Sequence, residues 1–330
     1  MLIDAGLLLL GLALLVGGGE VTVRGASALA REAGVPPVVV GLTVVAFGTS
    51  APELAVNVAA AVTGRGGVCF GNIVGSNLAN IGLILGTSAL LRPIRIRGVI
   101  ITREIPMMLL ATAAALVLGF DGALRGLPEA YDRADGLVLV LLFGVFLYYT
   151  AADVLRNRPD DALLREAREA GAPRLRAAAG AFCLTGVGLV ALAGGGRLAV
   201  DGAVGLARAF HVSEALIGLT LVAVGTSLPE LVASAMATLR GQADLAVGNV
   251  VGSNIFNLLF VGGVTAVIRP IRVPPGGHWD LWFLAAMSGV LLPLSISNSR
   301  SIVRLEGAAL LAAYLAYTAW RCLVAPGGAG

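Results

Sequence analysis

The sequence predicts an all-α polytopic membrane protein with ten transmembrane helices, arranged as two inverted repeats of five helices each. Three observations support this fold class. The chain of 330 residues is 57% hydrophobic and only 13% charged, whereas soluble domains carry about 25% charged residues. Apolar stretches close to the length of about 20 residues that a membrane helix needs recur from end to end. One stretch in each half is a copy of a stretch in the other.

The duplicated stretches are residues 41–86 and 218–263, which align without a gap at an offset of about 177 residues, with about 21 identities in 46 positions. The first contains GLTVVAFGTSAPEL and GNIVGSNLAN, and the second contains GLTLVAVGTSLPEL and GNVVGSNIFN. Each copy places one Glu, either Glu53 or Glu230, inside a long apolar segment. A duplicated polar cluster within hydrophobic sequence is typical of the substrate site of a secondary transporter.

Residues 1–152 form the predicted first repeat. A short connection with Arg24, Arg31 and Pro36–Pro37 follows its first apolar segment, and the motif RPIR follows its third. The five segments are expected at about residues 2–23, 38–62, 68–91, 98–120 and 136–152.

Residues 153–176 form the predicted cytosolic linker, the only long hydrophilic stretch in the chain, with about six Arg and five acidic residues. Within it, residues 161–170 are expected to form a short charged surface helix. The length of the stretch argues against a regulatory domain.

Residues 177–330 form the predicted second repeat, which follows the order of the first. The triple glycine at 194–196 aligns with that at 17–19, and a second RPIR motif matches the first. Because each half has an odd number of segments, the second copy is inverted in the membrane relative to the first. The segments are expected to begin near 177 and then to span about 215–239, 243–268, 279–296 and 302–324.

The distribution of arginine predicts the orientation. The sequence contains Arg but no Lys. With the N-terminus outside, about 15 Arg fall inside and about 8 fall outside. The positive-inside rule therefore favours an external N-terminus and a cytosolic central loop. We expect a multi-pass protein of the cell membrane, inner or plasma, that functions as a monomer with the lipid bilayer around it.

Glu53 and Glu230 are the chemically informative residues. A carboxylate in the bilayer interior is costly and usually faces a partner or a water-filled cavity. No Arg lies within either motif helix, so the natural counter-charge is a bound cation. The symmetric copies would bring the two carboxylates together near the midplane, where two negative charges suit one divalent cation, or sodium ions and protons in its place.

The neighbours of each Glu supply neutral oxygen atoms, which are hard ligands suited to sodium and calcium. A Gly and a Pro flank the hydroxyls in each copy, and a helix break there is expected to free backbone carbonyls such as those of Ala46 and Ala223. The hydroxyl residues are Thr49, Ser50, Thr226 and Ser227.

The second part of each motif adds further oxygen atoms. Ser and Asn recur four residues apart, so helical spacing places each pair on one face. Neither a thiolate nor a His occurs among these positions, which argues against zinc, copper or iron. The residues are Ser76 and Asn80 in the first copy, and Ser253 and Asn257 in the second.

Other polar residues have structural interpretations. Asn77 and Asn254 rotate away from these faces and are expected to serve in packing or capping. Glu20 has Arg24 four residues later, which predicts an ion pair at the membrane interface. Glu104 is expected to be an interface residue.

Several function classes are excluded or disfavoured. The net charge of +3 is small and dispersed, which argues against nucleic acid as a partner. The absence of HExxH and GxSxG motifs argues against a membrane enzyme. The three Cys and two His are isolated, so no prosthetic group is expected. A passive channel remains an alternative.

At the two motifs the sequence resembles the sodium/calcium exchanger family of the calcium/cation antiporter superfamily, over essentially the whole chain. The resemblance implies the exchanger fold, with a midplane cluster of four ion sites, and with the first and sixth segments sliding against the bundle. Both halves carry Asn at 80 and 257, whereas many prokaryotic members and the potassium-dependent exchangers have Asp at the second position. This difference weakens the case for potassium co-transport.

The resemblance also implies a set of ion ligands. The first repeat would contribute five side chains and one backbone carbonyl, and the second repeat would contribute their counterparts. The implied ligands are Thr49, Ser50, Glu53, Ser76, Asn80 and the Ala46 carbonyl, with Thr226, Ser227, Glu230, Ser253, Asn257 and the Ala223 carbonyl.

The predicted function is therefore a secondary antiporter that exchanges sodium for calcium by alternating access. Calcium and sodium would be bound only as transported ions. A proton/calcium antiporter is the alternative, because buried carboxylates can also bind protons. The resemblance to proton-coupled relatives is poorer, since those generally lack the paired Thr-Ser hydroxyls.

Overall fold

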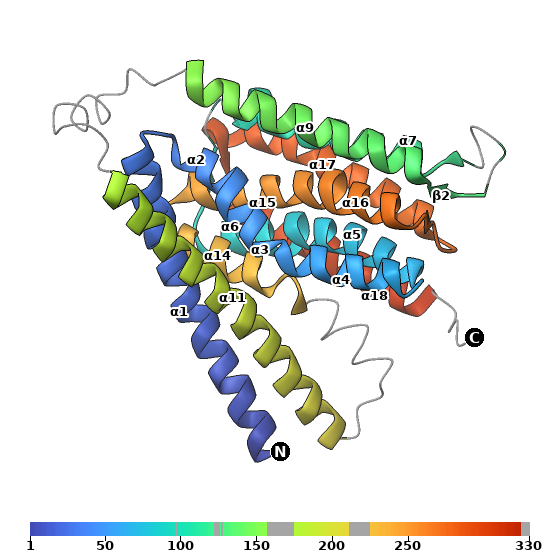
Figure 1. Ribbon diagram of the computed structural model, residues 1–330, viewed down its shortest axis with the longest axis horizontal. Coiled ribbons are helices and arrows are strands. Elements are labelled where there is room, and N and C mark those ends of the chain that lie inside the picture. Colours follow the sequence, from blue (N-terminus) through green and yellow to red (C-terminus); the bar gives the residue numbers. More distant parts are fainter. Residues whose placement is uncertain are drawn as a thin grey trace.

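The computed structural model describes residues 1–96, 98, 100–121, 126, 128–156, 175–210 and 225–324. Within these residues the protein is helical, apart from four strands of two residues each (Figure 1). Most of the predicted linker, including its charged helix, lies outside the described residues, as does Ala223.

The first half contains five helical segments, two of which include π-helical turns in mid-segment. Their elements are α1 (Leu2–Ala33), then α2 (Pro37–Val40), η1 (Gly41–Val45), α3 (Ala46–Thr49) and α4 (Ala51–Val62), then α5 (Gly66–Ala79), η2 (Asn80–Leu85) and α6 (Gly86–Leu91), then η3 (Ile100–Glu104) and α7 (Ile105–Leu118), and α9 (Arg133–Arg156).

The described second half follows the same order. Its helices are α11 (Leu175–Ala209), α14 (Leu228–Leu239), then α15 (Ala243–Ile255), η5 (Phe256–Val261) and α16 (Gly262–Ile268), then α17 (Gly277–Arg300) and α18 (Arg304–Val324). The strands are β1 (Ile94–Arg95), β2 (Ala130–Tyr131), β3 (Ile271–Arg272) and β4 (Ser301–Ile302).

Seven helices in the described chain are long and apolar enough to cross a membrane, and the bent pair formed by 37–49 and 51–62 makes an eighth. The predicted all-helical polytopic membrane fold is therefore confirmed. The remaining two predicted segments contain α14, of which 12 residues are described, and α18, which has 21 residues but is less apolar. A total of ten spans stays a prediction.

The first helix is longer than predicted, because it continues past Val23 to Ala33. Arg24 does not end it, since its side chain pairs with Glu20 one turn earlier on the same helix. The helix instead ends at Gly34, which has a φ of 66° and whose amide bonds to the carbonyls of the last turn. A single charged residue was therefore a poor marker of the helix end.

Helices α1 and α11 lie side by side, and together they extend beyond the rest of the bundle (Figure 1). Glycines spaced seven residues apart allow their backbones to approach closely. A Cβ atom on Gly11 would lie 2.3 Å from the backbone nitrogen of Ala199, and one on Gly195 would lie 2.8 Å from that of Leu15. This contact surface therefore depends on the absence of side chains.

The two halves contact each other in reciprocal pairs. Strand β1 of the first half pairs with β4 of the second, and β3 of the second half pairs with β2 of the first. A Cβ atom on Gly86 would lie 2.9 Å from the Gly307 carbonyl oxygen, and one on Gly263 would lie 2.9 Å from that of Gly136. Because each contact recurs with the halves exchanged, the described structure follows an approximate two-fold pattern.

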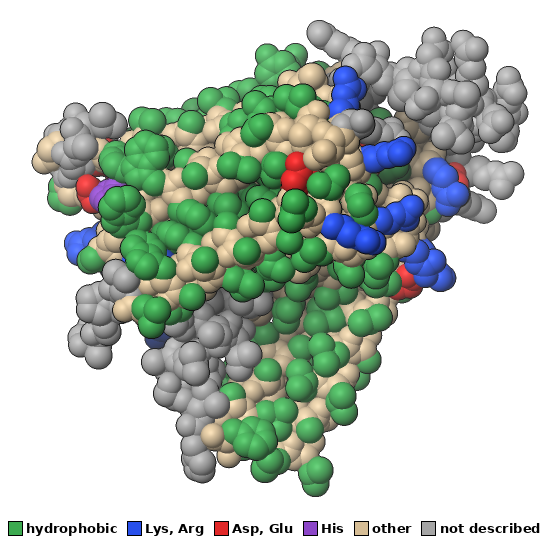
Figure 2. All heavy atoms as spheres, turned by 180° about the vertical axis from the view of Figure 1, so that it is seen from behind, with side chains coloured by type: hydrophobic (Ala, Val, Ile, Leu, Met, Phe, Trp, Pro, Cys, Tyr) green, Lys and Arg blue, Asp and Glu red, His purple; other side chains and the backbone are tan. Residues whose placement is uncertain are grey.

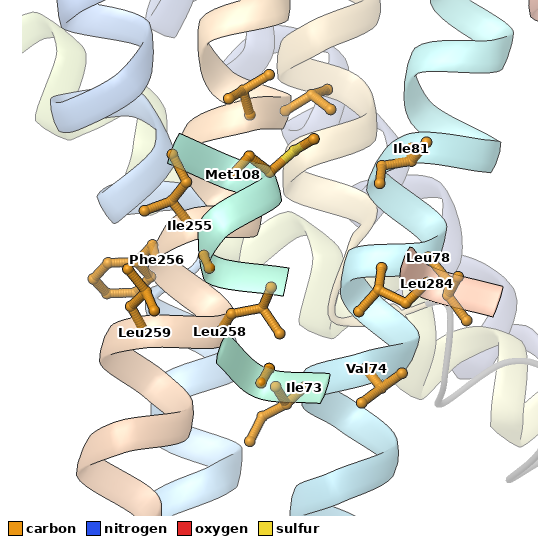
Figure 3. Close-up of a cluster of buried hydrophobic side chains, with 14 of the residues drawn as sticks. Ile73, Val74, Leu78, Ile81, Met108, Ile255, Phe256, Leu258, Leu259 and Leu284 are labelled. Atoms are coloured by element: carbon orange, nitrogen blue, oxygen red, sulfur yellow. The ribbon is translucent and has the colours of Figure 1, made fainter. Parts of the chain in front are cut away.

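A large apolar core holds α5 and α15, which carry the two GSN motifs, against α7 and α17 (Figure 3). Ile81, Met108 and Ile255 in this core have no exposed surface. On the outside, hydrophobic side chains spread over the flanks of the molecule, and most Arg side chains in this view gather at one end (Figure 2). This distribution suits a protein surrounded by lipid between two polar faces.

A small apolar cavity of about 20 Å³ lies in this core, lined by residues that include Phe70, Ile73 and Gly262. We expect Gly262→Ala to stabilise the protein, because the new methyl group would lie 3.8 Å from Ile73 Cδ1 without a clash. Removing a helical Gly is worth up to about 1 kcal/mol, which corresponds to a rise in Tm of about 2–4 °C. Thermal unfolding of the purified protein in detergent measures this change in Tm.

The adjacent substitution Gly263→Ala is the matched control for this prediction. Its Cβ atom would lie 2.8 Å from Val140 Cγ2 and 2.9 Å from the Gly136 carbonyl oxygen, so the Tm should fall. Equal decreases in Tm for the two variants would contradict the cavity argument.

Candidate ion-binding site

The predicted break in the second helical segment is confirmed at Ser50, which separates α3 from α4 at an angle of 43°. Ser50 has φ −86° and ψ 5°, and Ser227 before α14 has nearly the same conformation, φ −88° and ψ 4°. Pro52 lies in the first turn after the break and has no amide hydrogen to donate to the Gly48 carbonyl. Each motif therefore contains the same break, immediately before its Glu.

The break does not free the Ala46 carbonyl, as the sequence analysis expected. The Ala46 oxygen accepts the backbone amide of Ser50 at 3.0 Å, because the turn before the break stays helical. The Thr49 hydroxyl is 3.4 Å from the same oxygen but lies nearer to the Val45 carbonyl, at 3.0 Å. A carbonyl oxygen has two lone pairs, so one remains for a ligand while the hydroxyl donates to Val45. Ala223 lies outside the described residues.

Glu53 and Glu230 lie in the first turns of α4 and α14, and each is only 1% exposed. The N-terminus of a helix stabilises a carboxylate there. The Ser50 hydroxyl donates to Glu230 Oε1 at 2.8 Å. Glu53 lies near Thr226, Ser227 and Glu230. The two motifs thus meet at their carboxylates, one from each half.

The serine before each Glu is available for this contact because it does not cap its own helix. Ser at an N-cap commonly accepts a hydrogen bond from a backbone amide two or three residues later, but neither Ser50 nor Ser227 makes such a bond. Their hydroxyls are left free to interact across the junction of the two halves.

Several buried oxygen atoms of the site have no hydrogen-bond partner among the described residues. A buried acceptor without a partner costs about 1–3 kcal/mol, and an unpaired buried charge costs more. No described Arg or His forms an ion pair with either carboxylate. A bound cation would satisfy all of these oxygens together. They are Glu53 Oε1 and Oε2, Glu230 Oε2, Ser227 Oγ, Ser253 Oγ, Asn80 Oδ1 and Asn257 Oδ1.

Hydrogen bonds across the two halves involve five of the predicted ligands, which are Thr49, Ser50, Asn80, Thr226 and Glu230. Asn80 Nδ2 donates to Asn254 Oδ1 at 3.0 Å. Ser253 and Asn257, which are 0% and 1% exposed, lie on the facing helical segment, and their side chains have no hydrogen-bond partner among the described residues. The side chains predicted to bind ions lie on α3, α4, α5, η2, α14, α15 and η5, and at the breaks before α4 and α14.

Comparison with known proteins identifies the family. A family model described as sodium/calcium exchanger protein matches residues 3–152 and 180–323. The chain belongs to the sodium/calcium exchanger family. It is 34% identical over 341 residues to the sodium/calcium exchanger MaX1 of Methanosarcina acetivorans, covering 94% of this chain and 96% of that one.

Two further comparisons give one relative of this exchanger by sequence and one by structure. It is 39% identical over 277 residues to inner membrane protein YrbG of Escherichia coli strain K12, with 83% of each chain covered. Its structure resembles that of the sodium-calcium exchanger NCX_Mj soaked with 10 mM Na⁺ and 10 mM Sr²⁺, with a TM-score of 0.83, 32% identity, and 96% and 98% of the two chains covered. The exchanger fold is therefore confirmed, and the protein is a transporter rather than an enzyme.

Asn77 and Asn254 of this exchanger differ in role, although the sequence analysis gave them the same one. Asn77 Nδ2 donates to the Ile73 carbonyl of its own helix at 2.7 Å, so its hydrogen bond is local to that helix and a packing role stays a prediction. Asn254 instead accepts from the site residue Asn80, so the expectation that it rotates away from the cluster was wrong. A residue that turns away from its own half can meet the other half.

Sequence reasoning missed two amides of the site, Asn72 and Asn249, which begin the GNxxGSN motifs. Thr226 and Ser76 both donate toward Asn72 Oδ1, at 3.4 Å and 3.5 Å. Thr49 donates to Asn249 Oδ1 at 3.2 Å. Their spacing could have indicated them, because each Asn lies four residues before the predicted Ser and shares its helix face.

Two acidic residues outside the cluster have local partners. The ion pair between Glu20 and Arg24 is confirmed, and Arg240 Nε also donates to Glu20 at 2.9 Å, which joins α1 to α14. Glu104 is 1% exposed and accepts from Arg103 Nε at 2.7 Å. It is therefore buried in the protein, and its position at the membrane interface stays a prediction.

The triple glycines of the exchanger have three different surroundings. Gly18 and Gly195 face the partner helix, whereas nothing lies within 4 Å of a Cβ atom on Gly17 or Gly194. A Cβ atom on Gly19 would lie 2.9 Å from Val232 of α14. The middle and last glycines of the first triplet thus permit close packing, while sliding along these surfaces stays a prediction.

Proposed function

We propose that this exchanger carries sodium and calcium in opposite directions across the membrane, by alternating access at one buried site. The observation that carries the proposal is the meeting of two unpaired carboxylates from opposite halves, surrounded by buried acceptors. The proposed ligands are the side chains of Thr49, Ser50, Glu53, Ser76, Asn80, Thr226, Ser227, Glu230, Ser253 and Asn257, with the carbonyls of Ala46 and Ala223.

The charge of the site explains why one pocket would serve both ions. Two carboxylates neutralise one Ca²⁺ or two Na⁺, and both ions prefer hard oxygen ligands. Calcium and sodium therefore compete for the same oxygens. Each sodium ion beyond two would leave net positive charge in the loaded site, so exchange with more than two sodium ions would be electrogenic.

Relatives support this assignment of the ions. MaX1 is named a sodium/calcium exchanger, and the NCX_Mj structure was soaked with Na⁺ and Sr²⁺. Strontium is, like calcium, a divalent cation that favours oxygen ligands. We carry this chemistry to the present chain because its two Glu and the surrounding hydroxyls form the required oxygen-rich site.

The proposed mechanism alternates access by moving α1 and α11 relative to the remaining bundle. Coupling follows if only ion-loaded states change access. We further propose that residues 1–152 and 177–330 act as inverted repeats joined by a cytosolic linker at 153–176, with the N-terminus outside. YrbG is named an inner membrane protein, and we propose the same location and a monomeric functional unit.

The direct test is calcium-45 uptake into proteoliposomes that contain sodium, placed in a sodium-free bath with the pH clamped. The proposal predicts uptake that requires internal sodium. A membrane-potential dye should report charge movement if more than two sodium ions leave per calcium. Uptake that ignores sodium would overturn sodium coupling.

A proton/calcium antiporter is the second candidate, favoured by the same buried carboxylates, which could bind protons in place of sodium. An outward-directed proton gradient, imposed on proteoliposomes that lack sodium on both sides of the membrane, distinguishes the two. Calcium uptake driven by this gradient would assign proton coupling, and its absence would support sodium coupling.

A further inference from the structure

Two hydrogen bonds at the site form a reciprocal pair across the halves. The Thr49 hydroxyl donates to Asn249 Oδ1 at 3.2 Å, and the Thr226 hydroxyl donates to Asn72 Oδ1 at 3.4 Å. In each bond, the threonine comes from the break of one half and the asparagine from the GNxxGSN helix of the other. The same contact is therefore made twice, with the halves exchanged.

The chemistry of a hydroxyl makes this contact relevant to a cation. A hydroxyl has one hydrogen and two lone pairs, and only a lone pair can bind a cation. Thr49 also has acceptors in its own helix, the carbonyls of Val45 at 3.0 Å and Ala46 at 3.4 Å. Asn249 Oδ1 adds an acceptor from the opposite half at 3.2 Å, so the hydroxyl hydrogen has a protein acceptor on each half and a lone pair of the oxygen stays available to a cation.

Each asparagine amide has contacts that fix its orientation. Asn249 is 1% exposed, and its Nδ2 donates to Ser234 Oγ on α14 at 2.9 Å, which directs its oxygen toward Thr49. Asn72 is half-buried, and its Nδ2 lies 3.5 Å from the Glu53 carbonyl oxygen. Both amides therefore contact a helix that carries one of the two carboxylates.

We propose that Asn72 and Asn249 are positioning residues, which hold the hydroxyl hydrogens of Thr226 and Thr49 away from the ion so that each oxygen presents a lone pair. This inference rests on the proposed function, because it concerns ligands of the same site. It implies that an ion bound to a threonine of one half depends on a helix of the other half.

The test replaces each amide by Leu, which has a similar size but accepts no hydrogen bond. Asn249→Leu and Asn72→Leu should each raise the half-saturating concentration of calcium or sodium by about fivefold, the effect of losing one hydrogen bond. The readouts are flux in proteoliposomes and the calcium concentration that gives half of the ion-induced rise in Tm. Asn72 is the less buried of the two, so its variant remains informative if Asn249→Leu does not fold.

Asn77→Leu is the matched control, because Asn77 is a buried amide on the same helix as Asn72 whose Nδ2 donates to Ile73 of its own helix, and whose Oδ1 accepts no hydrogen bond from the described residues. It should leave the half-saturating ion concentrations unchanged. Asn72→Asp keeps an acceptor oxygen and should not weaken ion binding. A purely packing role would instead make the effects of Asn72→Leu and Asn77→Leu alike.

A double substitution tests whether Asn249 acts through Thr49. Thr49→Val combined with Asn249→Leu should bind ions no more weakly than Thr49→Val alone. Additive effects of the two substitutions on the half-saturating ion concentration would overturn this inference only. The same holds if Asn72→Leu and Asn249→Leu bind ions as Asn77→Leu does, while the wild type shows sodium-dependent calcium flux. A wild type whose calcium flux ignores sodium would overturn the proposed function instead.

Discussion

Replacing either Glu53 or Glu230 by Gln is expected to abolish sodium-driven calcium flux. Each substitution removes one of the two buried charges, both 1% exposed, that would balance Ca²⁺. Removing one partner of a buried charge pair costs about 3–5 kcal/mol, or about 10²–10⁴-fold in affinity. Calcium-45 uptake by reconstituted variants measures the loss.

Gln nearly preserves the size of Glu, so both variants should fold and keep the Tm of the ion-free protein or exceed it, since a buried charge is removed. Glu32→Gln is the control, because Glu32 lies in the last turn of α1, outside the cluster, and its flux should remain normal. Near-normal sodium-driven flux in Glu53→Gln or Glu230→Gln would remove the basis of the proposed site.

The second large effect is expected from adding a methyl group to the contact between α1 and α11. In Gly11→Ala the new Cβ atom would lie 2.3 Å from the Ala199 backbone nitrogen, and a backbone atom cannot move without shifting its helix. Such overpacking costs about 1–3 kcal/mol, occasionally more. We expect a lower Tm and a large loss of flux, measured in detergent and in proteoliposomes.

Gly17→Ala and Gly194→Ala are the matched controls, because nothing lies within 4 Å of a Cβ atom at either position. Replacing a helical Gly by Ala there should leave the Tm unchanged or raise it, by up to about 1 kcal/mol in free energy of unfolding. Equal values of Tm and flux in Gly11→Ala and in these controls would contradict a tightly packed contact between α1 and α11.

The fold class and the main chemistry could be predicted because they are properties of single segments. Apolar length indicates a membrane helix, and a Pro with flanking hydroxyls indicates the break that the structure has at Ser50. The duplication indicated that Glu53 and Glu230 would meet, and the 2.8 Å hydrogen bond from Ser50, three residues before Glu53, to Glu230 supports this. None of these predictions required knowledge of how the helices pack against one another.

The errors concern contacts between halves and the ends of helices. The partners of Asn254 and Asn249 lie about 174 and 200 residues away in the chain, where the helical periodicity of one segment carries no information. The α1 end was missed because the ion pair between Glu20 and Arg24 allows charges to continue the helix. The Ala46 carbonyl was wrongly expected to be free, because a break in a helix frees only the carbonyls whose amide donors it removes. The Ser50 amide still donates to the Ala46 oxygen.

Equilibrium binding of calcium-45 to the purified protein, as sodium is increased at constant ionic strength, tests the shared site most directly. A single shared site predicts that sodium displaces all specifically bound calcium and that the displacement is competitive. It also predicts that Glu53→Gln binds neither ion with an affinity comparable to that of the wild type. Calcium that stays bound at saturating sodium, or binding unaffected by Glu53→Gln, would contradict a single site formed by the two carboxylates.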